Sequence, residues 1–390
     1  MSSRKVYMDH SATTFVDPGV LEKMLPFFSE KYGNPNSVHA WGREVRSCVD
    51  EARSKVAALV NAEPREILFT GGGSEADNLA IKGVAEVLCE KGRHVITSAI
   101  EHHAVLDTVK WLGRHGFEVT VLPVDRDGLV DVNQFRDAIR KDTILASVMF
   151  ANNEVGTVQP IRELGNICRE KGVLFHTDAV QAAGHIPIDL KELPVDLMTM
   201  AAHKMYGPKG VGALYVRKGV RISPLVHGGG QEFGLRSGTE NTAGIVGFGA
   251  AAELGARRLL NGDVDKERVL RDRLIDGVLE RVEDVRLTGH RTLRLPFHAS
   301  FCIRYIEGEA MLLRLDFAGI GASSGSACTS GSLEPSYVLL AMGLDHATAH
   351  GSLRLTLGKD TVVEDIDYIL ETLPPIVQAL RAMSPFKKNG

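Results

Sequence analysis

Between about residues 66 and 218, short apolar runs alternate with longer stretches whose apolar residues recur at helical spacing. The stretch Ile161–Lys171 shows this helical spacing and is followed by Gly172, a residue type that commonly ends helices. Further helices are predicted over 77–91 and 104–115. The apolar runs are rich in β-branched and aliphatic residues, as buried strands are: EILF, HVITS, EVTVLPV, TILASVMF, VLFHTDAV, DLMTMAA and GALYVRK. This alternation predicts βαβ units and a largely parallel sheet.

The pattern changes after the glycine-rich segment HGGGQEFGLRSGTEN at residues 227–241. A long charged helix is predicted near 264–283, and strand and helix pieces follow up to about residue 380. We therefore expect an α/β fold with a large domain over 15–260. A smaller α+β domain would comprise 1–14 and 261–390. Because no proline-rich linker separates them, the two domains should pack around a shared cleft, where active sites commonly lie.

Composition limits the classes of function. The chain has 390 residues, is 44% hydrophobic and carries a formal net charge of -4, with no long run of one charge sign. A nucleic-acid or anionic-membrane protein would show a basic patch. No window holds the roughly 18 apolar residues of a membrane helix, and the first residues lack the apolar stretch of a signal peptide. We therefore expect a cytoplasmic protein that acts on a small molecule or a protein partner.

Five cysteines, at positions 48, 89, 168, 302 and 328, form no CxxC pair. Their odd number argues against a disulfide framework, and their spacing argues against a structural zinc site. Four of them fall in amphipathic or apolar stretches and are predicted to fill the core. Cys328 instead lies in ASSGSACTSGSLEPS, a loop predicted at about 321–335 between a strand and a helix. Because such a loop is accessible to solvent, Cys328 is the candidate reactive thiol.

The most informative pair is Asp178 in HTDAVQ, at the end of one predicted strand, and Lys204 in AAHKMYGPKG, just past the end of the next. Ligands of open α/β sheets gather outside the carboxyl ends of the strands. A lysine there can form a Schiff base with an aldehyde cofactor, and an aspartate on the neighbouring strand can keep a pyridine nitrogen protonated. The plain alternative for this pair alone is a turn-capping aspartate and a solvated lysine.

A glycine-rich turn, GGGSEADN at 71–78, follows the strand EILFT and opens a predicted helix. Gly73, Ser74 and the first helical N–H groups can face an anion such as a cofactor phosphate. The turn matches neither GxGxxG nor GxxxxGK[ST], so a dinucleotide or a nucleoside triphosphate is not expected. A loop with an ordinary capped helix is the alternative.

Many segments, in a fixed order over nearly the whole chain, resemble the class V, aspartate-aminotransferase-like enzymes that use pyridoxal 5'-phosphate (PLP). Within them the chain resembles the IscS/NifS-type cysteine desulfurases. The matching segments are YMDHSATTFVDP, GNPNSVHAWG, FTGGGSEADNLAI, IEHHAVLD, ANNEVGTVQPI, HTDAVQAAG, HKMYGPKGVGALY, GGGQEFGLRSGTEN, SSGSACTSGSLEPSYVLLAMG and HGSLRLTLG. The resemblance implies the PLP-dependent transferase fold type I, with a mainly parallel seven-stranded sheet carrying helices on both faces. The SSGSAC loop is similar to the long-loop group of the family rather than to the short-loop group.

The resemblance also implies a role for each site residue. Lys204 would hold the cofactor, His102 would stack on its ring and move protons, and Cys328 would take the sulfur of L-cysteine and leave L-alanine. Arg354 would bind the substrate carboxylate beside Asn153, because a planar guanidinium donates two parallel hydrogen bonds. The other residues expected to bind the cofactor are Gly73, Ser74, Asn153, Asp178, Gln181, His203 and Thr239.

Partners follow from the same resemblance. Thr239, in RSGTEN, is expected to reach the phosphate of a neighbouring subunit, which implies a homodimer. Cys328 is expected to pass its sulfur to an iron–sulfur scaffold protein of the IscU type, and it could also ligate a nascent cluster. The sequence departs from the family pattern at Ala201, where a hydroxyl residue usually bonds the phosphate. Gly71 and Gly73 also replace the more usual Ser and Ala.

Two alternatives stay open. Another reaction of the same fold, such as selenocysteine lyase or transamination, would use the same cofactor site. A catalytically dead homologue would serve as a docking or regulatory subunit of a sulfur-transfer complex. That hypothesis predicts the loss of Lys204, Cys328 or Arg354, and all three are present.

Overall fold

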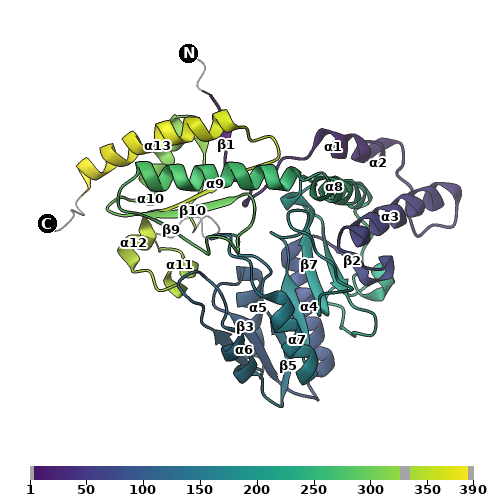
Figure 1. Cartoon of the computed structure of the whole chain (residues 1–390). Helices are drawn as coiled ribbons and strands as arrows, with labels where there is room; N and C mark the ends of the chain where they lie inside the picture. Colours follow the sequence, from purple (N-terminus) through teal and green to yellow (C-terminus); the bar gives the residue numbers. More distant parts are fainter. Residues whose placement is uncertain (1–3, 326–333, 385–390) are drawn as a thin grey trace.

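The chain forms a central sheet of seven strands flanked by helices, with a smaller group of strands beside it (Figure 1). The computed structural model of the protein describes residues 4–325 and 334–384. The strands lie in the order β2 (Ile67–Thr70), β8 (Gly212–Val216), β7 (Leu197–Ala201), β6 (Leu174–Asp178), β5 (Thr143–Ser147), β3 (His94–Ser98) and β4 (Glu118–Leu122). Within this sheet β8 runs antiparallel to both of its neighbours and the other pairs are parallel. The predicted mainly parallel seven-stranded sheet is confirmed.

Helices cover both faces of the central sheet. One face packs against α4 (Gly73–Leu88) and α5 (His103–Gly113). The other packs against α7 (Ile161–Lys171), with α3 (Ala40–Leu59) and α8 (Thr242–Leu260) in the same apolar core. Strands buried on both faces are rich in apolar residues, and this explains the long apolar runs in their sequences.

Helix boundaries follow the sequence signals to within a few residues: α4 ends at Leu88 and not at 91, and α5 spans His103–Gly113 and not 104–115. Helix α7 spans the predicted residues, and Gly172 ends it in the left-handed conformation, with φ of 69°. Helix α4, in contrast, begins at Gly73, four residues before the predicted start at residue 77. Its first turn has small and polar residues, so the apolar periodicity begins only in the second turn.

The smaller sheet is antiparallel, in the order β12 (Ser352–Thr356), β10 (His298–Ile303), β9 (Val285–Leu287). Helix α9 (Asp263–Arg281), which matches the predicted charged helix, lies beside α13 (Val363–Met383) over this sheet (Figure 1). The remaining α-helices and strands are β1 (Val6–Tyr7), α1 (Pro18–Met24), α2 (Pro26–Ser29), α6 (Val132–Ala138), α10 (Gly308–Phe317), β11 (Ile320–Gly321), α11 (Tyr337–Ala341) and α12 (His346–His350).

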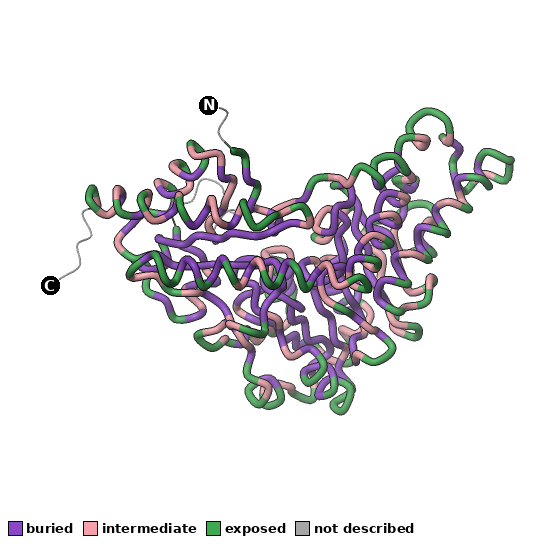
Figure 2. Tube along the Cα trace, turned by 45° about the horizontal axis from the view of Figure 1, so that its top comes forward, coloured by how far each residue is buried: buried purple, intermediate pink, exposed green. Residues whose placement is uncertain are grey.

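One apolar core joins the two sheets. The cluster around Phe175 and Met198 of the central sheet continues to Phe301 and Leu355 of the smaller sheet. Figure 2 shows buried residues throughout this interior and exposed residues in the outer loops. Strand β1 pairs with β11, so the N-terminal segment lies with the C-terminal elements. The domain boundaries at residues 14 and 260 stay a prediction. Among the described residues, no helix is long and apolar enough to cross a membrane.

Candidate active site

A cavity of about 300 Å³ lies at the carboxyl ends of β5, β6 and β7. This is the edge of the sheet where the sequence predicted a ligand. Its lining includes these predicted site residues: Gly73, Ser74, His102, Asn153, Asp178, Gln181, His203, Lys204 and Arg354. Thr239 is exposed and does not line this cavity. Cys328 lies outside the described residues.

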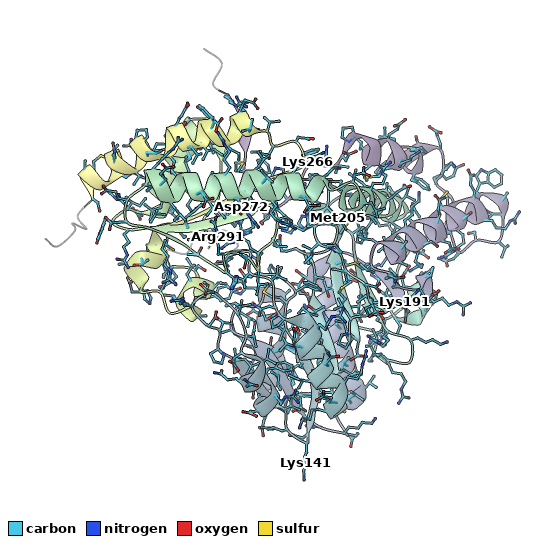
Figure 3. All side chains as sticks on the ribbon, viewed as in Figure 1. Lys141, Lys191, Met205, Lys266, Asp272 and Arg291 are labelled. Atoms are coloured by element: carbon cyan, nitrogen blue, oxygen red, sulfur yellow. The ribbon has the colours of Figure 1, made fainter. Side chains whose placement is uncertain are left out.

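Lys204 lies in the short 3-10 helix η2 (Ala202–Lys204), directly after β7. Its Nζ donates hydrogen bonds to the backbone oxygens of Ser11, at 2.5 Å, and Ala12, at 2.7 Å. The amine therefore points into the cavity and rests on the N-terminal segment. Met205, the residue after Lys204, is buried in the interior, whereas Lys141 lies at the far end of the molecule (Figure 3).

Asp178 is the last residue of β6, and its carboxyl group is buried. Its Oδ1 accepts a hydrogen bond from the backbone N–H of Val180 at 2.9 Å. Burial raises the pKa of Asp178, and the charges of His102 and Lys204 oppose this shift. A buried carboxylate in this position needs a cationic partner, and a protonated ring nitrogen would supply one.

A second buried carboxyl group, that of Asp77, lines the same cavity and was not predicted. Burial, and then the charge of Asp178, raise the pKa of Asp77 well above its usual value. Two carboxylates in one apolar site repel each other, so the one without a cation keeps its proton. The raised pKa of Asp77 favours its protonated form beside Asp178. Its position in GGGSEADN gave no sign of this, because an aspartate near the start of a helix is common.

His102 is the N-cap residue of α5, where its Nδ1 accepts a hydrogen bond from the backbone N–H of Ala104 at 3.1 Å. Burial lowers the pKa of His102, against the charge of Asp178. The ring is therefore neutral, with its proton on Nε2. A neutral imidazole beside the cavity can accept a proton in a reaction and return it.

The start of α4 forms the anion-binding end of the cavity. Its N-cap residue is Gly72, and Gly73 and Ser74 lie on the cavity wall. A Cβ atom on Gly73 would come within 2.9 Å of Val180 Cγ2, so a larger residue here would require the Val180 side chain to shift. The first N–H groups and the positive end of a 16-residue helix attract an anion.

His203 lies at the same end, and its Nδ1 is 3.1 Å from the hydroxyl oxygen of Thr13. Burial, and then the charges of Lys204 and Lys209, lower the pKa of His203 to about 4. A second cavity of about 480 Å³ shares Gly73, Ser74 and His203 and adds Lys209 as a further cation. Ala201 also lines the first cavity, and its methyl group offers no hydrogen bond.

Arg354 lies on β12 and lines the same cavity. Its Nη2 donates to Asp9 Oδ1 at 2.8 Å, and its Nη1 donates to the backbone oxygen of Asn153 at 3.1 Å. The Nε atom is buried and has no hydrogen-bond partner among the described residues. An unpaired buried donor of a charged group is costly, and a carboxylate ligand would satisfy it.

The N-terminal segment 9–14 is the part of the site that sequence reasoning missed. It holds Arg354 through Asp9 and Lys204 through two backbone oxygens. The backbone oxygen of Ser11 also accepts from Gln181 Nε2 at 3.0 Å. Backbone oxygens leave no mark in a sequence, so the only available signal was the family match of YMDHSATTFVDP.

Among the other cysteines, Cys168 and Cys302 are buried, as predicted for core residues. Burial raises the pKa of both thiols, that of Cys302 to about 12, which leaves them unreactive at neutral pH. Cys48 and Cys89 are half-buried instead, so the prediction of core positions holds only in part.

An α/β sheet with a lysine and a buried aspartate at the ends of adjacent strands, and a helix N-terminus facing the same cavity, defines a PLP-enzyme type of fold and site. The chain belongs to the Aminotransferase class-V family, whose pattern matches residues 6–369. A cysteine desulfurase IscS from Clostridium botulinum is 55% identical over 385 residues, which cover 98% of this chain and 97% of the relative.

Solved structures agree with this assignment. A NifS-like protein superimposes with a TM-score of 0.91 at 41% identity, covering 97% of this chain and all of the other. SspA, in a structure described as a complex with cysteine, superimposes with a TM-score of 0.81 at 36% identity. It covers 92% of this chain and all of the other.

Proposed function

We propose that this chain is a PLP-dependent cysteine desulfurase that converts L-cysteine to L-alanine. The observation that carries the proposal is the pairing, across one cavity, of an amine and a buried carboxyl group with an arginine whose Nε lacks a partner. Such a site suits an amino-acid substrate beside an aldehyde cofactor. The 55% identical relative is named a cysteine desulfurase, and the SspA structure is described as containing cysteine.

The residues present fit PLP. Lys204 would hold its aldehyde carbon, Asp178 would face its ring nitrogen, and His102 would lie on its ring. Ser74, His203 and the start of α4 would surround its phosphate, while Asn153 and Gln181 would contact the ring's polar groups. Bound PLP supplies an electron sink for cleavage of bonds at the substrate carbons.

Three residues of this chain then have separate roles in the reaction. Arg354 binds the substrate carboxylate and so fixes the amino group toward Lys204. The neutral His102 can donate its Nε2 proton and take it back, because Nδ1 is held by the backbone N–H of Ala104. The Cys328 thiol attacks the substrate sulfur: a sulfur–sulfur bond forms as the carbon–sulfur bond breaks. Overall, L-cysteine and the Cys328 thiol give L-alanine and a Cys328 persulfide, which conserves atoms and electrons.

The sulfur acceptor is proposed to be an iron–sulfur scaffold protein, because the SSGSAC segment resembles the long-loop group of the family. Cys328 would present the persulfide to it and could ligate a forming cluster for a short time. Another copy of this chain is proposed as the second partner, with Thr239 reaching the phosphate site of that copy. The exposure of several large apolar side chains supports a covered surface: Phe28, Tyr32, Val38, Trp41 and Phe233.

One experiment tests the activity directly. Purified protein with PLP is mixed with L-cysteine and a reductant, and alanine and sulfide are measured together. Equal amounts of both products are expected. PLP binding without either product would favour a different class V reaction or a regulatory subunit. Release of alanine from L-selenocysteine but not from L-cysteine would make the chain a selenocysteine lyase.

A further inference from the structure

Two positions past Lys204, the backbone adopts a conformation that residues other than glycine rarely take. Tyr206 has φ of 67°, in the left-handed region. Such a conformation persists only where the surroundings hold it, and it occurs often at functional sites. The contacts that hold Tyr206 in this conformation therefore also fix the path of the backbone from the end of β7 through Lys204.

Thr14 contacts the backbone on both sides of Lys204. Its hydroxyl group donates to the backbone oxygen of His203 at 3.0 Å and accepts from the backbone N–H of Tyr206 at 2.9 Å. Its own N–H also donates to His203 O at 3.0 Å. Thr14 is buried at 2% exposure, and it does not line the cavity that contains Lys204 Nζ. The side chain thus acts on the peptide groups around Lys204 and not on a ligand.

His185 contacts the backbone carbonyl of Lys204 itself. Its Nε2 donates to the backbone oxygen of Lys204 at 2.8 Å. A carbonyl only accepts, so the proton of this ring lies on Nε2. The ring is buried against Phe297, with ring centroids 4.4 Å apart, and is fixed in orientation by this packing.

We propose that Thr14 and His185 are positioning residues that orient Lys204 for reaction with the aldehyde of PLP. Thr14 fixes the peptide groups before and after the lysine, and His185 fixes the carbonyl of the lysine itself. The N-terminal backbone oxygens of Ser11 and Ala12 then hold Nζ at the end of the same side chain. This inference rests on the proposed attachment of PLP to Lys204.

The test compares Thr14→Val with Thr14→Ser. Valine matches the volume of threonine but lacks the hydroxyl group, whereas serine keeps it. Apoprotein is mixed with PLP, and attachment to Lys204 is followed by borohydride trapping and peptide mass. Losing two hydrogen bonds to this segment should slow attachment roughly tenfold in Thr14→Val, and Thr14→Ser should restore the rate.

Thr143→Val is the matched control. Thr143 is also a buried threonine whose hydroxyl contacts two groups, Arg140 N and His94 Nδ1, but it lies at the amino end of β5. This variant should attach PLP at the wild-type rate even if it unfolds at a lower temperature. Attachment at the wild-type rate in Thr14→Val, or equal slowing in Thr143→Val, would overturn the positioning role.

His185 supplies a second pair of variants if Thr14→Val does not fold. His185→Leu should slow attachment, and His185→Gln, which keeps an N–H donor, should slow it less. Equal rates in both would count against the inference. Because the readout is PLP attachment without cysteine, it separates two failures. A protein that binds PLP normally but yields no alanine refutes desulfuration and leaves the positioning role intact. A wild-type chain that never attaches PLP refutes both.

Discussion

Arg354 is fixed by two groups before any ligand arrives. Asp9 and the Asn153 backbone oxygen occupy its two terminal nitrogens and leave Nε for a carboxylate. The guanidinium therefore needs little reorganisation when substrate binds, which is how preorganised sites gain affinity. The ion pair with Asp9 also keeps the buried cation partnered in the absence of substrate.

Replacing Arg354 by alanine should mainly weaken binding of L-cysteine. A buried carboxylate left without its charged partner costs about 2 to 5 kcal/mol, so KM should rise roughly 30-fold or more while kcat changes less. Steady-state rates over a range of cysteine concentrations measure this. Arg286→Ala, an arginine whose side chain donates to Arg126 O near the surface, is the control. If the rate depends on cysteine concentration as it does in the wild type, Arg354 does not bind the substrate carboxylate.

Lys204→Ala should abolish covalent attachment of PLP. Among the residues that line this cavity, Lys204 carries the amine that lies with Asp178 and the start of α4. Trapping with borohydride followed by peptide mass should find no modified lysine. Lys110→Ala is the control, since Lys110 is exposed on α5 and lines neither of the two cavities. We expect the peptide that contains Lys204 to be modified in Lys110→Ala and no lysine to be modified in Lys204→Ala. Modification of another lysine in Lys204→Ala would assign the cofactor to that residue.

Cys328→Ser should keep PLP attached but lose persulfide and sulfide. The serine hydroxyl is a far weaker nucleophile toward sulfur than a thiolate. Persulfide labelling and sulfide assays after addition of L-cysteine check this. Cys89→Ser, a change at a half-buried cysteine next to the end of α4, should keep both products. Full sulfide release by Cys328→Ser would exclude Cys328 as the acceptor.

At the scale of elements, the turn after β3 is joined through Glu101 to the end of β3 and to the segment that follows β5. The carboxyl group of Glu101 accepts from Ser98 Oγ at 2.5 Å and from the backbone N–H of Met149 at 2.9 Å. Burial raises the pKa of Glu101 to about 8. The folded chain therefore holds a proton here that the unfolded chain releases at a lower pH, near 4.5.

This raised pKa predicts a pH dependence of stability. Between pH 4.5 and 8 the folded state binds more protons at Glu101, so the contribution is full below pH 4.5 and is lost as pH rises through 8. Glu101→Gln mimics the protonated group and should flatten the decline in unfolding free energy over this range. Urea unfolding at pH 5, 6.5 and 8 measures the slope, with exposed Glu86→Gln as control. An unchanged slope in Glu101→Gln would show that Glu101 is ionised in the folded chain.

Sequence patterns predicted the helices and strands better than they predicted the contacts between them. The strand at 94–98 and the helix at 161–171 were predicted to the residue, because apolar periodicity and a C-terminal glycine mark them. Asp178 and Lys204 were predicted to lie close together because neighbouring parallel strands end at the same edge of the sheet. The role of segment 9–14 could not be predicted, since it acts through backbone oxygens and one carboxylate 345 positions from its partner.

At the scale of the molecule, large apolar side chains gather near the start of α3. Val38 is 88% exposed and Trp41 58% exposed. Exposed apolar groups this close together commonly mark a surface that another chain covers. Glu240, next to Thr239, is buried and accepts from Asn36 and Arg46 of the same region. The segment that carries Thr239 is therefore joined to this surface.

Trp41→Asp should yield a monomer with weaker PLP binding, because a carboxylate would be buried in the proposed dimer interface. Sedimentation velocity and PLP retention during dialysis measure the two effects. Phe317→Asp is the control, since Phe317 of α10 is also exposed, at 84%, and belongs to a different surface. A dimer that survives Trp41→Asp would place the subunit contact elsewhere.

The position of Arg354 on β12 has a consequence for the order of events during protein synthesis. Lys204 and the strands around it precede Arg354 by 150 residues, the difference between 354 and 204. At about 5 to 20 residues per second, roughly 8 to 30 s pass between the two leaving the ribosome. Throughout that interval the nascent chain has its lysine but no arginine for the carboxylate. Binding of the substrate carboxylate at Arg354 therefore has to wait until β12 has been made and has paired with β10.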